Sequence, residues 1–122
     1  MTKLERRHLF AAKLAELICL ADTENIRIAP FSVYRTAEEQ RKLYDQGKSK
    51  CDGYIKRSRH QDWLACDWGI LNDAGTDFLW SDKRYDRLGE LAVKVGLVWG
   101  GNWDAEKNGF SDPYHVELPE NV

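Results

Sequence analysis

Two histidines and two aspartates carry the first chemistry that this sequence suggests. His60 and Asp67 lie close together in one segment, and His115 follows Asp112 in another. Two imidazoles and one carboxylate suit a catalytic zinc ion, which takes three protein ligands and keeps a fourth position open. Asp112 is then a spare carboxylate, and a base of this kind takes a proton from water as the water attacks a carbonyl. Together the four side chains predict a zinc hydrolase site.

The length and composition of the chain fit one compact domain. It has 122 residues, of which 43% are hydrophobic, and this is enough to bury a core. No internal repeat or linker divides the sequence, so we expect a single domain over residues 1–122. The formal net charge is -2 and the pI is about 5.9, which excludes the broad cationic field of a nucleic-acid binder or a polybasic membrane protein. We expect a monomer with neither a nucleic-acid nor a membrane partner.

The amino terminus and the cysteines indicate a cytoplasmic site of synthesis. The first residues are charged and run into a pattern with Lys13 and Glu16, so the apolar core of a signal peptide is missing. No stretch approaches the roughly 20 apolar residues that cross a bilayer. Cys19, Cys51 and Cys66 are an odd number at spacings that fit neither a disulfide framework nor a paired-cysteine zinc site, so we expect free thiols.

Local patterns predict an α+β fold. Hydrophobic periodicity predicts helices over residues 3–21 and 85–95, and Thr36 with Glu39 forms a capping box for a helix that ends near Gly47. Strand patterns cover residues 26–33, 63–71, 97–103 and 114–118. The turns between the elements are short, so we expect a small antiparallel sheet with flanking helices and the zinc site in an open groove.

The alternation of side chains along the strands places the chemistry on one face. Asp67 and Cys66 point to opposite faces, so Cys66 is expected to be a buried small hydrophobe rather than a ligand. His115 and Glu117 share a face, and neighbouring strands would bring Asp67 and His115 onto one metal, with His60 joining from a loop. Taken singly, each residue has an ordinary alternative, because lone histidines are usually surface or core residues and an aspartate before proline is usually a turn former.

The sequence also resembles a known family. Ser58-Arg59-His60 through Ala65-Cys66-Asp67 resembles the Ser-x-His-(x)6-Asp signature of the zinc D-alanyl-D-alanine peptidases, which include the vancomycin-resistance dipeptidases and many phage endolysins. The segment 112–118 is similar to the second motif of that family. Segments 34–49 and 100–103 resemble the endolysin branch that cleaves between L-alanine and D-glutamate in peptidoglycan. The similarity spans roughly residues 31 to 118.

The resemblance implies roles for five residues. His60, Asp67 and His115 would bind zinc, and Asp112 would be the catalytic base. Arg35 would hold the substrate or stabilise the oxyanion, and a guanidinium can indeed grip a peptide carboxylate through paired hydrogen bonds. The alternative for Arg35 is a solvated charge before a helix cap.

Four further residues have open roles. Ser58 either orients the site or the substrate or shapes a turn, and Glu117 either supports the zinc ligand His115 or is a surface glutamate. Trp103 is either a core residue or a platform for substrate. Trp63 stands where the family usually has glycine, so its indole must either pack on the core or reshape the groove.

The function expected from the resemblance is hydrolysis of peptidoglycan stem peptides. The first expectation is an L-alanyl-D-glutamate endopeptidase that acts as a phage or prophage endolysin and reaches the wall, in the periplasm, only after release. A D-alanyl-D-alanine carboxypeptidase is the first alternative. An alternative of another class is a noncatalytic zinc module that binds a wall peptide or a protein, against which the presence of Asp112 argues.

Overall fold

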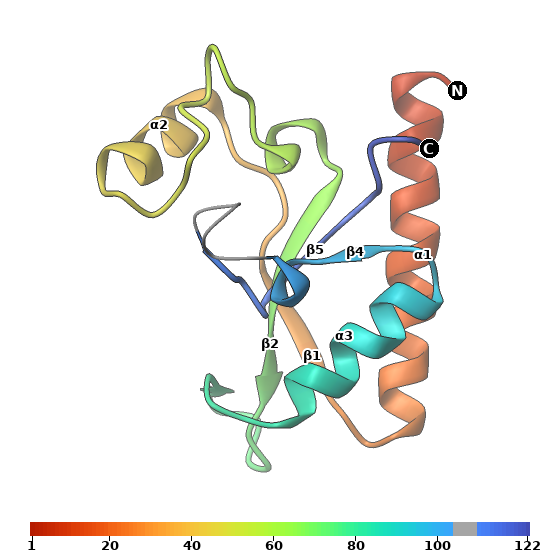
Figure 1. Cartoon of the computed structure of the whole chain (residues 1–122). Helices are drawn as coiled ribbons and strands as arrows, with labels where there is room; N and C mark the ends of the chain where they lie inside the picture. The colour runs from red at the N-terminus through yellow and green to blue at the C-terminus, as the bar shows by residue number, and fades with distance from the viewer. Residues whose placement is uncertain (104–109) are drawn as a thin grey trace.

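An antiparallel sheet forms the centre of the molecule (Figure 1). The computed structural model describes residues 1–103 and 110–122, and all statements below refer to these residues. The strands pair in the order β1-β2-β5-β4, and β3 pairs with β2 beyond the end of β5. Their bounds are β1 Ile28–Ser32, β2 Ala65–Leu71, β3 Phe78–Leu79, β4 Val98–Trp99 and β5 His115–Glu117. The predicted α+β architecture is confirmed.

Three α-helices surround the sheet, and capping boxes explain where the first two begin. Helix α1 spans Lys3–Thr23 after the N-cap Thr2, and α2 spans Ala37–Asp45 after the predicted capping box of Thr36 and Glu39. Helix α3 spans Arg84–Lys94, and the chain turns after it at Gly96, whose φ of +93° suits glycine. Two short 3₁₀ turns, η1 Arg59–Asp62 and η2 Gly100–Asn102, precede β2 and follow β4.

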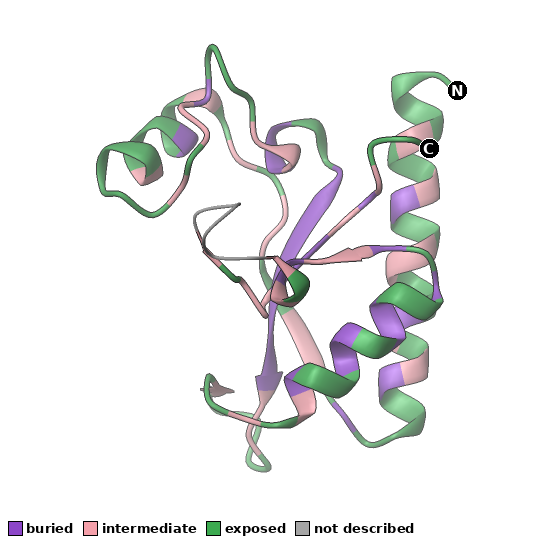
Figure 2. Ribbon diagram, viewed as in Figure 1, coloured by how far each residue is buried: buried purple, intermediate pink, exposed green. Residues whose placement is uncertain are grey.

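Helices α1 and α3 cover one face of the sheet and leave the other face for the site. Cys66 and Trp68 of β2 are buried against Leu17 of α1 and Leu91 of α3, and Figure 2 shows this burial along β2 and α3. Helix α2 lies on the other side of β2 from α1 (Figure 1). Because side chains alternate along a strand, the burial of Cys66 turns Asp67 to the opposite, uncovered face.

The cysteines behave as expected. Cys66 is 1% exposed, and burial raises the pKa of its thiol to about 12. All three cysteines are free. No helix in the described ranges is long and apolar enough to span a bilayer.

Several strand boundaries differ from the sequence prediction. The strand predicted over residues 63–71 begins only at Ala65, because Trp63 has a φ of +61° and ends the turn η1 instead. The strand predicted over residues 97–103 ends at Trp99, where Gly100 begins η2. Strand β3 was not predicted, since a strand of two residues is too short to show alternation. Much of the predicted polar loop, residues 104–109, lies outside the described residues.

Candidate metal centre

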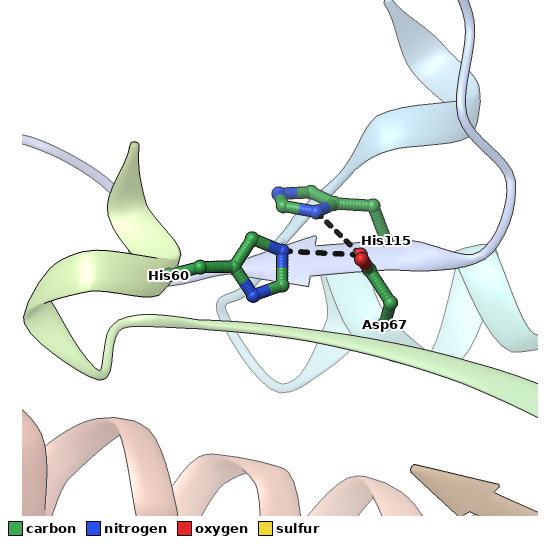
Figure 3. A group of neighbouring side chains, drawn as sticks. All are labelled: His60, Asp67 and His115. Carbon is green, nitrogen blue, oxygen red and sulfur yellow. Dashed lines mark hydrogen bonds and ion pairs between the residues drawn. The ribbon is translucent and has the colours of Figure 1, made fainter. Parts of the chain in front are cut away.

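Three secondary-structure elements bring His60, Asp67 and His115 together (Figure 3). Asp67 of β2 and His115 of β5 are direct partners in the antiparallel ladder, so their side chains project from the same face. His60 enters from η1, whose first turn is capped by Ser58 through its Oγ, which accepts from the His60 N–H. The predicted ligands therefore meet in space, although they come from distant parts of the sequence.

The ligand atoms converge on the Asp67 carboxylate. Oδ1 of Asp67 lies 2.8 Å from Nδ1 of His115 and 3.2 Å from Nε2 of His60. One ligand atom from each residue can be chosen so that all lie within 4.8 Å of one another, and all three residues are buried. This group of side chains could hold one metal ion.

The outer nitrogen of each histidine is already occupied. Nδ1 of His60 lies 3.0 Å from the carbonyl of Val33, and Nε2 of His115 lies 2.8 Å from Oε1 of Glu117. Each contact favours the tautomer in which the outer nitrogen carries the proton, which leaves the inner nitrogen as a lone-pair donor. Zinc-bound histidines are held in this way by carbonyls and carboxylates.

The inner nitrogen of His60 provides a direct test of whether a cation fits. Nε2 is buried and lacks a hydrogen-bond partner among the described residues, yet it faces Oδ1 of Asp67. In the tautomer set by Val33, both of these atoms are acceptors, and two facing acceptors repel unless a cation lies between them. The donor set of two nitrogens and one oxygen is one that zinc accepts.

The charges of the cluster shift its pKa values strongly. Burial alone would raise the pKa of Asp67, but the hydrogen bond with His115 and the charges that the two histidine rings can carry outweigh burial and hold the pKa well below its usual range. Burial would lower the pKa of His115, yet hydrogen bonds with Asp67 and Glu117 raise it to about 9. Without a metal, a proton on His115 therefore neutralises the carboxylates. A metal ion would displace that proton.

Arg35 lies at the edge of the cluster and contacts a ligand directly. Its Nη2 donates to Oδ2 of Asp67 at 2.7 Å, so Oδ1 is the oxygen left to face the histidines. Nη1 donates to Oε1 of Gln40, and Nε donates to the hydroxyl of Ser32. The solvated alternative for Arg35 does not hold, because its side chain is only 18% exposed and paired. Two of its five N–H groups have no partner among the described residues.

Gln40 is a residue of the site that sequence reasoning missed. It is 0% exposed, and besides accepting from Arg35 it donates to the hydroxyl of Ser49 and the carbonyl of Cys51, both at 2.8 Å. It thereby ties the Arg35 guanidinium to the loop that follows α2. The sequence signal was a glutamine within the motif segment 34–49, but only packing reveals that it is buried.

Asp112 lies on the rim beside the cluster. Its Oδ1 accepts from the backbone N–H of Tyr114 at 3.1 Å, and its own N–H donates to the carbonyl of Gly100. An added Cβ at Gly100 would lie 2.5 Å from the backbone oxygen of Asp112, so only glycine permits this close approach. Burial raises the pKa of Asp112, and the charge of Asp67 raises it further.

An open groove of about 930 Å³ connects these residues. Arg35, Ser58, Asp112, Glu117 and Trp103 all line it together with the three clustered residues. The Trp103 ring lies 4.9 Å from the His115 ring, between centroids. The Oγ of Ser58 accepts from the N–H of His60, and Oε1 of Glu117 lies 2.8 Å from Nε2 of His115.

Trp63 does neither of the things expected of it. It is 40% exposed, so it is not part of the core, and it does not line the groove. It points to another surface, where its ring stacks on Tyr34 with centroids 4.6 Å apart. Its positive φ gives a physical reason for the usual glycine at this position.

Solved structures of peptidoglycan peptidases share this fold. The vancomycin resistance D,D-pentapeptidase VanY from a VanB-type cassette, solved with Zn(II), aligns with a TM-score of 0.68 and 19% identity, covering 89% of this chain and 70% of that one. The L-Ala D-Glu endopeptidase ChiX of Serratia marcescens aligns with a TM-score of 0.64 and 22% identity, covering 79% and 69%. The chain thus has a VanY-like fold.

Sequence comparison finds a similar peptidoglycan peptidase. The peptidoglycan L-alanyl-D-glutamate endopeptidase CwlK of Bacillus subtilis (strain 168) is 29% identical over 103 residues, which are 72% of this chain and 58% of CwlK. The chain therefore spans less than two thirds of that relative. No protein-family model matches the chain. The resemblance to the zinc D-alanyl-D-alanine peptidases is confirmed, and the predicted zinc agrees with the cluster and with the Zn(II) of VanY.

Proposed function

We propose that the chain is a zinc peptidase that hydrolyses peptidoglycan stem peptides. The observation that carries the proposal is the buried Nε2 of His60, which faces Oδ1 of Asp67 at 3.2 Å while Val33 holds the other ring nitrogen. A divalent cation would stabilise this arrangement of acceptors, and His115 would complete its ligand set through Nδ1. The similarity to CwlK, ChiX and VanY supports peptide bonds of the wall as the target.

The residues around the cluster supply the remaining parts of a hydrolase. When bound, zinc supplies Lewis acidity, which polarises a carbonyl and lowers the pKa of water. Asp112 accepts the proton of the attacking water. Burial moves the pKa of Asp112 toward neutral pH, and a base is most effective when its pKa lies near the working pH. Arg35 fixes the orientation of Asp67 and directs its remaining N–H groups to a substrate oxygen.

The preferred substrate bond is the one between L-alanine and D-glutamate. Two relatives, CwlK and ChiX, are named as endopeptidases for that bond, and the motif segments 34–49 and 100–103 resemble the same branch. A D-alanyl-D-alanine carboxypeptidase is the second candidate, because VanY is named as a D,D-pentapeptidase. Action as a phage or prophage endolysin, on the wall after release, is part of the proposal and rests on the motif resemblance alone.

Digestion of purified peptidoglycan tests the proposal. The zinc-loaded chain is incubated with peptidoglycan, and the new termini are determined by mass spectrometry. New amino-terminal D-glutamate supports the endopeptidase, and released D-alanine supports the carboxypeptidase. Wall binding without any new terminus would reject both and leave a noncatalytic zinc module. His60→Ala is the matched control, since it removes a ligand and should abolish every new terminus.

A further inference from the structure

A second hollow lies outside the groove, between the first turns of α1 and the segment that carries His60. It has a volume of about 570 Å³, and α1 contributes Lys3, Arg6 and Arg7 to it, while residues 57–64 form the other wall. We propose that this basic hollow binds the phosphate group of an organic phosphate ester. The proposal goes beyond the peptidase function and does not depend on the metal cluster.

The charge of the hollow is the first argument. Five of its lining residues are basic and one is acidic, although the whole chain carries a net charge of -2. The acidic residue, Asp62, is already paired with Arg57 at 2.7 Å. Lys3, Arg6 and Arg7 make no ion pair within the two described ranges. An uncompensated cluster of this density favours an anion with more than one charge.

Unused donors are the second argument. Nε and Nη2 of Arg6 are buried and have no hydrogen-bond partner in the described part of the chain. Burying such donors without a partner is costly, so a rearrangement of the Arg6 side chain that brings them to an acceptor in the hollow would be favoured. A guanidinium matches the oxygens of a phosphate with paired, charge-assisted hydrogen bonds, and a tetrahedral phosphate can accept from several cations at once.

The conformation of Trp63 is the third argument. The residue keeps a bulky side chain at a φ of +61°, where glycine would be free of strain. The indole lies between Tyr34, stacked at 4.6 Å, and the guanidinium of Arg7, 4.9 Å from the ring centroid. The strained residue thus fixes Arg7 at the edge of the basic hollow. This arrangement organises the cation before a ligand arrives, which reduces the entropy lost on binding.

The surroundings indicate a phosphate attached to a carbon skeleton. Leu4 is 70% exposed and Trp63 is 40% exposed, and both line the hollow. These apolar surfaces suit the organic part of the ester, and the volume fits a small ligand. Arg57 and Arg59 line both the basic hollow and the groove. An ester bound in the hollow would therefore lie next to the groove.

Binding measurements on matched variants test the proposal. The zinc-loaded chain is titrated with glycerol phosphate by calorimetry, and it is sedimented with vesicles of phosphatidylglycerol and phosphatidylcholine or of phosphatidylcholine alone. Arg6→Gln/Arg7→Gln should weaken binding at least about tenfold, because charge-assisted hydrogen bonds are lost. Lys42→Gln/Lys83→Gln changes the net charge equally at exposed sites and should leave binding nearly unchanged. Circular dichroism and cleavage of a soluble stem peptide verify that all variants are folded.

Each result decides the proposal. Binding of glycerol phosphate that depends on Arg6 and Arg7 supports a soluble ester, and binding to phosphatidylglycerol vesicles alone supports a lipid headgroup as the source. Equal binding by both double variants, equal sedimentation with both kinds of vesicle, or no binding of either probe overturns it. Trp63→Ala is an independent variant, because it should weaken binding by releasing Arg7.

Discussion

Replacement of Asp112 by asparagine is the most direct test of catalysis. The amide is nearly isosteric, and its oxygen can still accept from the Tyr114 N–H, which lies 3.1 Å from Oδ1 in the structure. The fold should not suffer, since burial and the charge of Asp67 both disfavour the Asp112 carboxylate and raise its pKa. The ability to accept a proton is lost. The turnover number should fall by roughly 10² to 10⁴, the usual contribution of a positioned acid or base.

Glu117→Gln is the matched control, because it also removes one carboxylate next to His115. Oε1 of Glu117 lies 2.8 Å from Nε2 of His115, and a glutamine oxygen can accept the same hydrogen bond without the charge. Arg59, 3.5 Å from the Glu117 carboxylate, loses its ionic partner. The expected loss of turnover is on the order of tenfold, as for the loss of a group that supports a metal ligand.

The assay compares the rates of stem-peptide cleavage at saturating zinc, with the zinc content of each variant measured in parallel. The rate of the parent protein should fall on acidification, because protonation of Asp112 removes the base. A parent-like rate in Asp112→Asn with intact zinc would refute the assignment. An equal collapse in Glu117→Gln would move the base to that residue.

Four further perturbations test the metal, Arg35, His115 and Trp63. The purified protein should carry about one zinc per chain by elemental analysis. Chelation should lower its thermal midpoint, because a ligand bound only by the folded state stabilises that state. A zinc content near zero together with chelator-resistant activity would reject the metal site. Arg35→Ala should lose most turnover and weaken zinc binding by roughly 10-fold to 100-fold, because Arg35 orients Asp67. Arg35→Lys should recover only part of the turnover. Full activity in Arg35→Ala would contradict this role. In the metal-free protein, the pKa of His115 is raised from 6.5 to about 9. The proton on His115 therefore stabilises the folded state fully below about pH 6.5, and this stabilisation is lost as the pH rises through about 9. A thermal midpoint that stays constant across that pH interval would contradict the ion pair. Trp63→Gly should be more stable than Trp63→Ala by about 1 kcal/mol, since both lose the stack with Tyr34 but only glycine relieves the positive φ; equal unfolding free energies would reject the strain.

The helices and the residue types of the metal ligands could be predicted from the sequence. The capping box of Thr36 and Glu39 sets the start of α2 through contacts between residues that are near in sequence, and Gly96 marks the turn after α3 in the same way. The alternation of Cys66 and Asp67 also follows from local strand geometry, so their opposite faces were predicted correctly. Strand ends were less accurate, because Trp63 adopts a conformation that its residue type disfavours.

The contacts that turn three ligands into a site come from distant segments. The carbonyl of Val33 selects the tautomer of His60, and Gln40 ties Arg35 to the loop after α2. A backbone carbonyl leaves no mark in a sequence pattern, and a glutamine gives no sign of whether it is buried. Only packing places these groups within hydrogen-bond distance.

The sequence by itself determined which side chains can bind a metal and which strand faces carry them, because both depend on residue type and on spacing along one element. The tertiary structure decided the rest. It paired Asp67 with His115 across two strands, directed Arg35 onto Asp67 and turned Trp63 away from the groove. These outcomes depend on the register of β2 with β5 and on how η1 packs beside the two strands. Both are set by burial and hydrogen bonding between segments that are distant in the sequence.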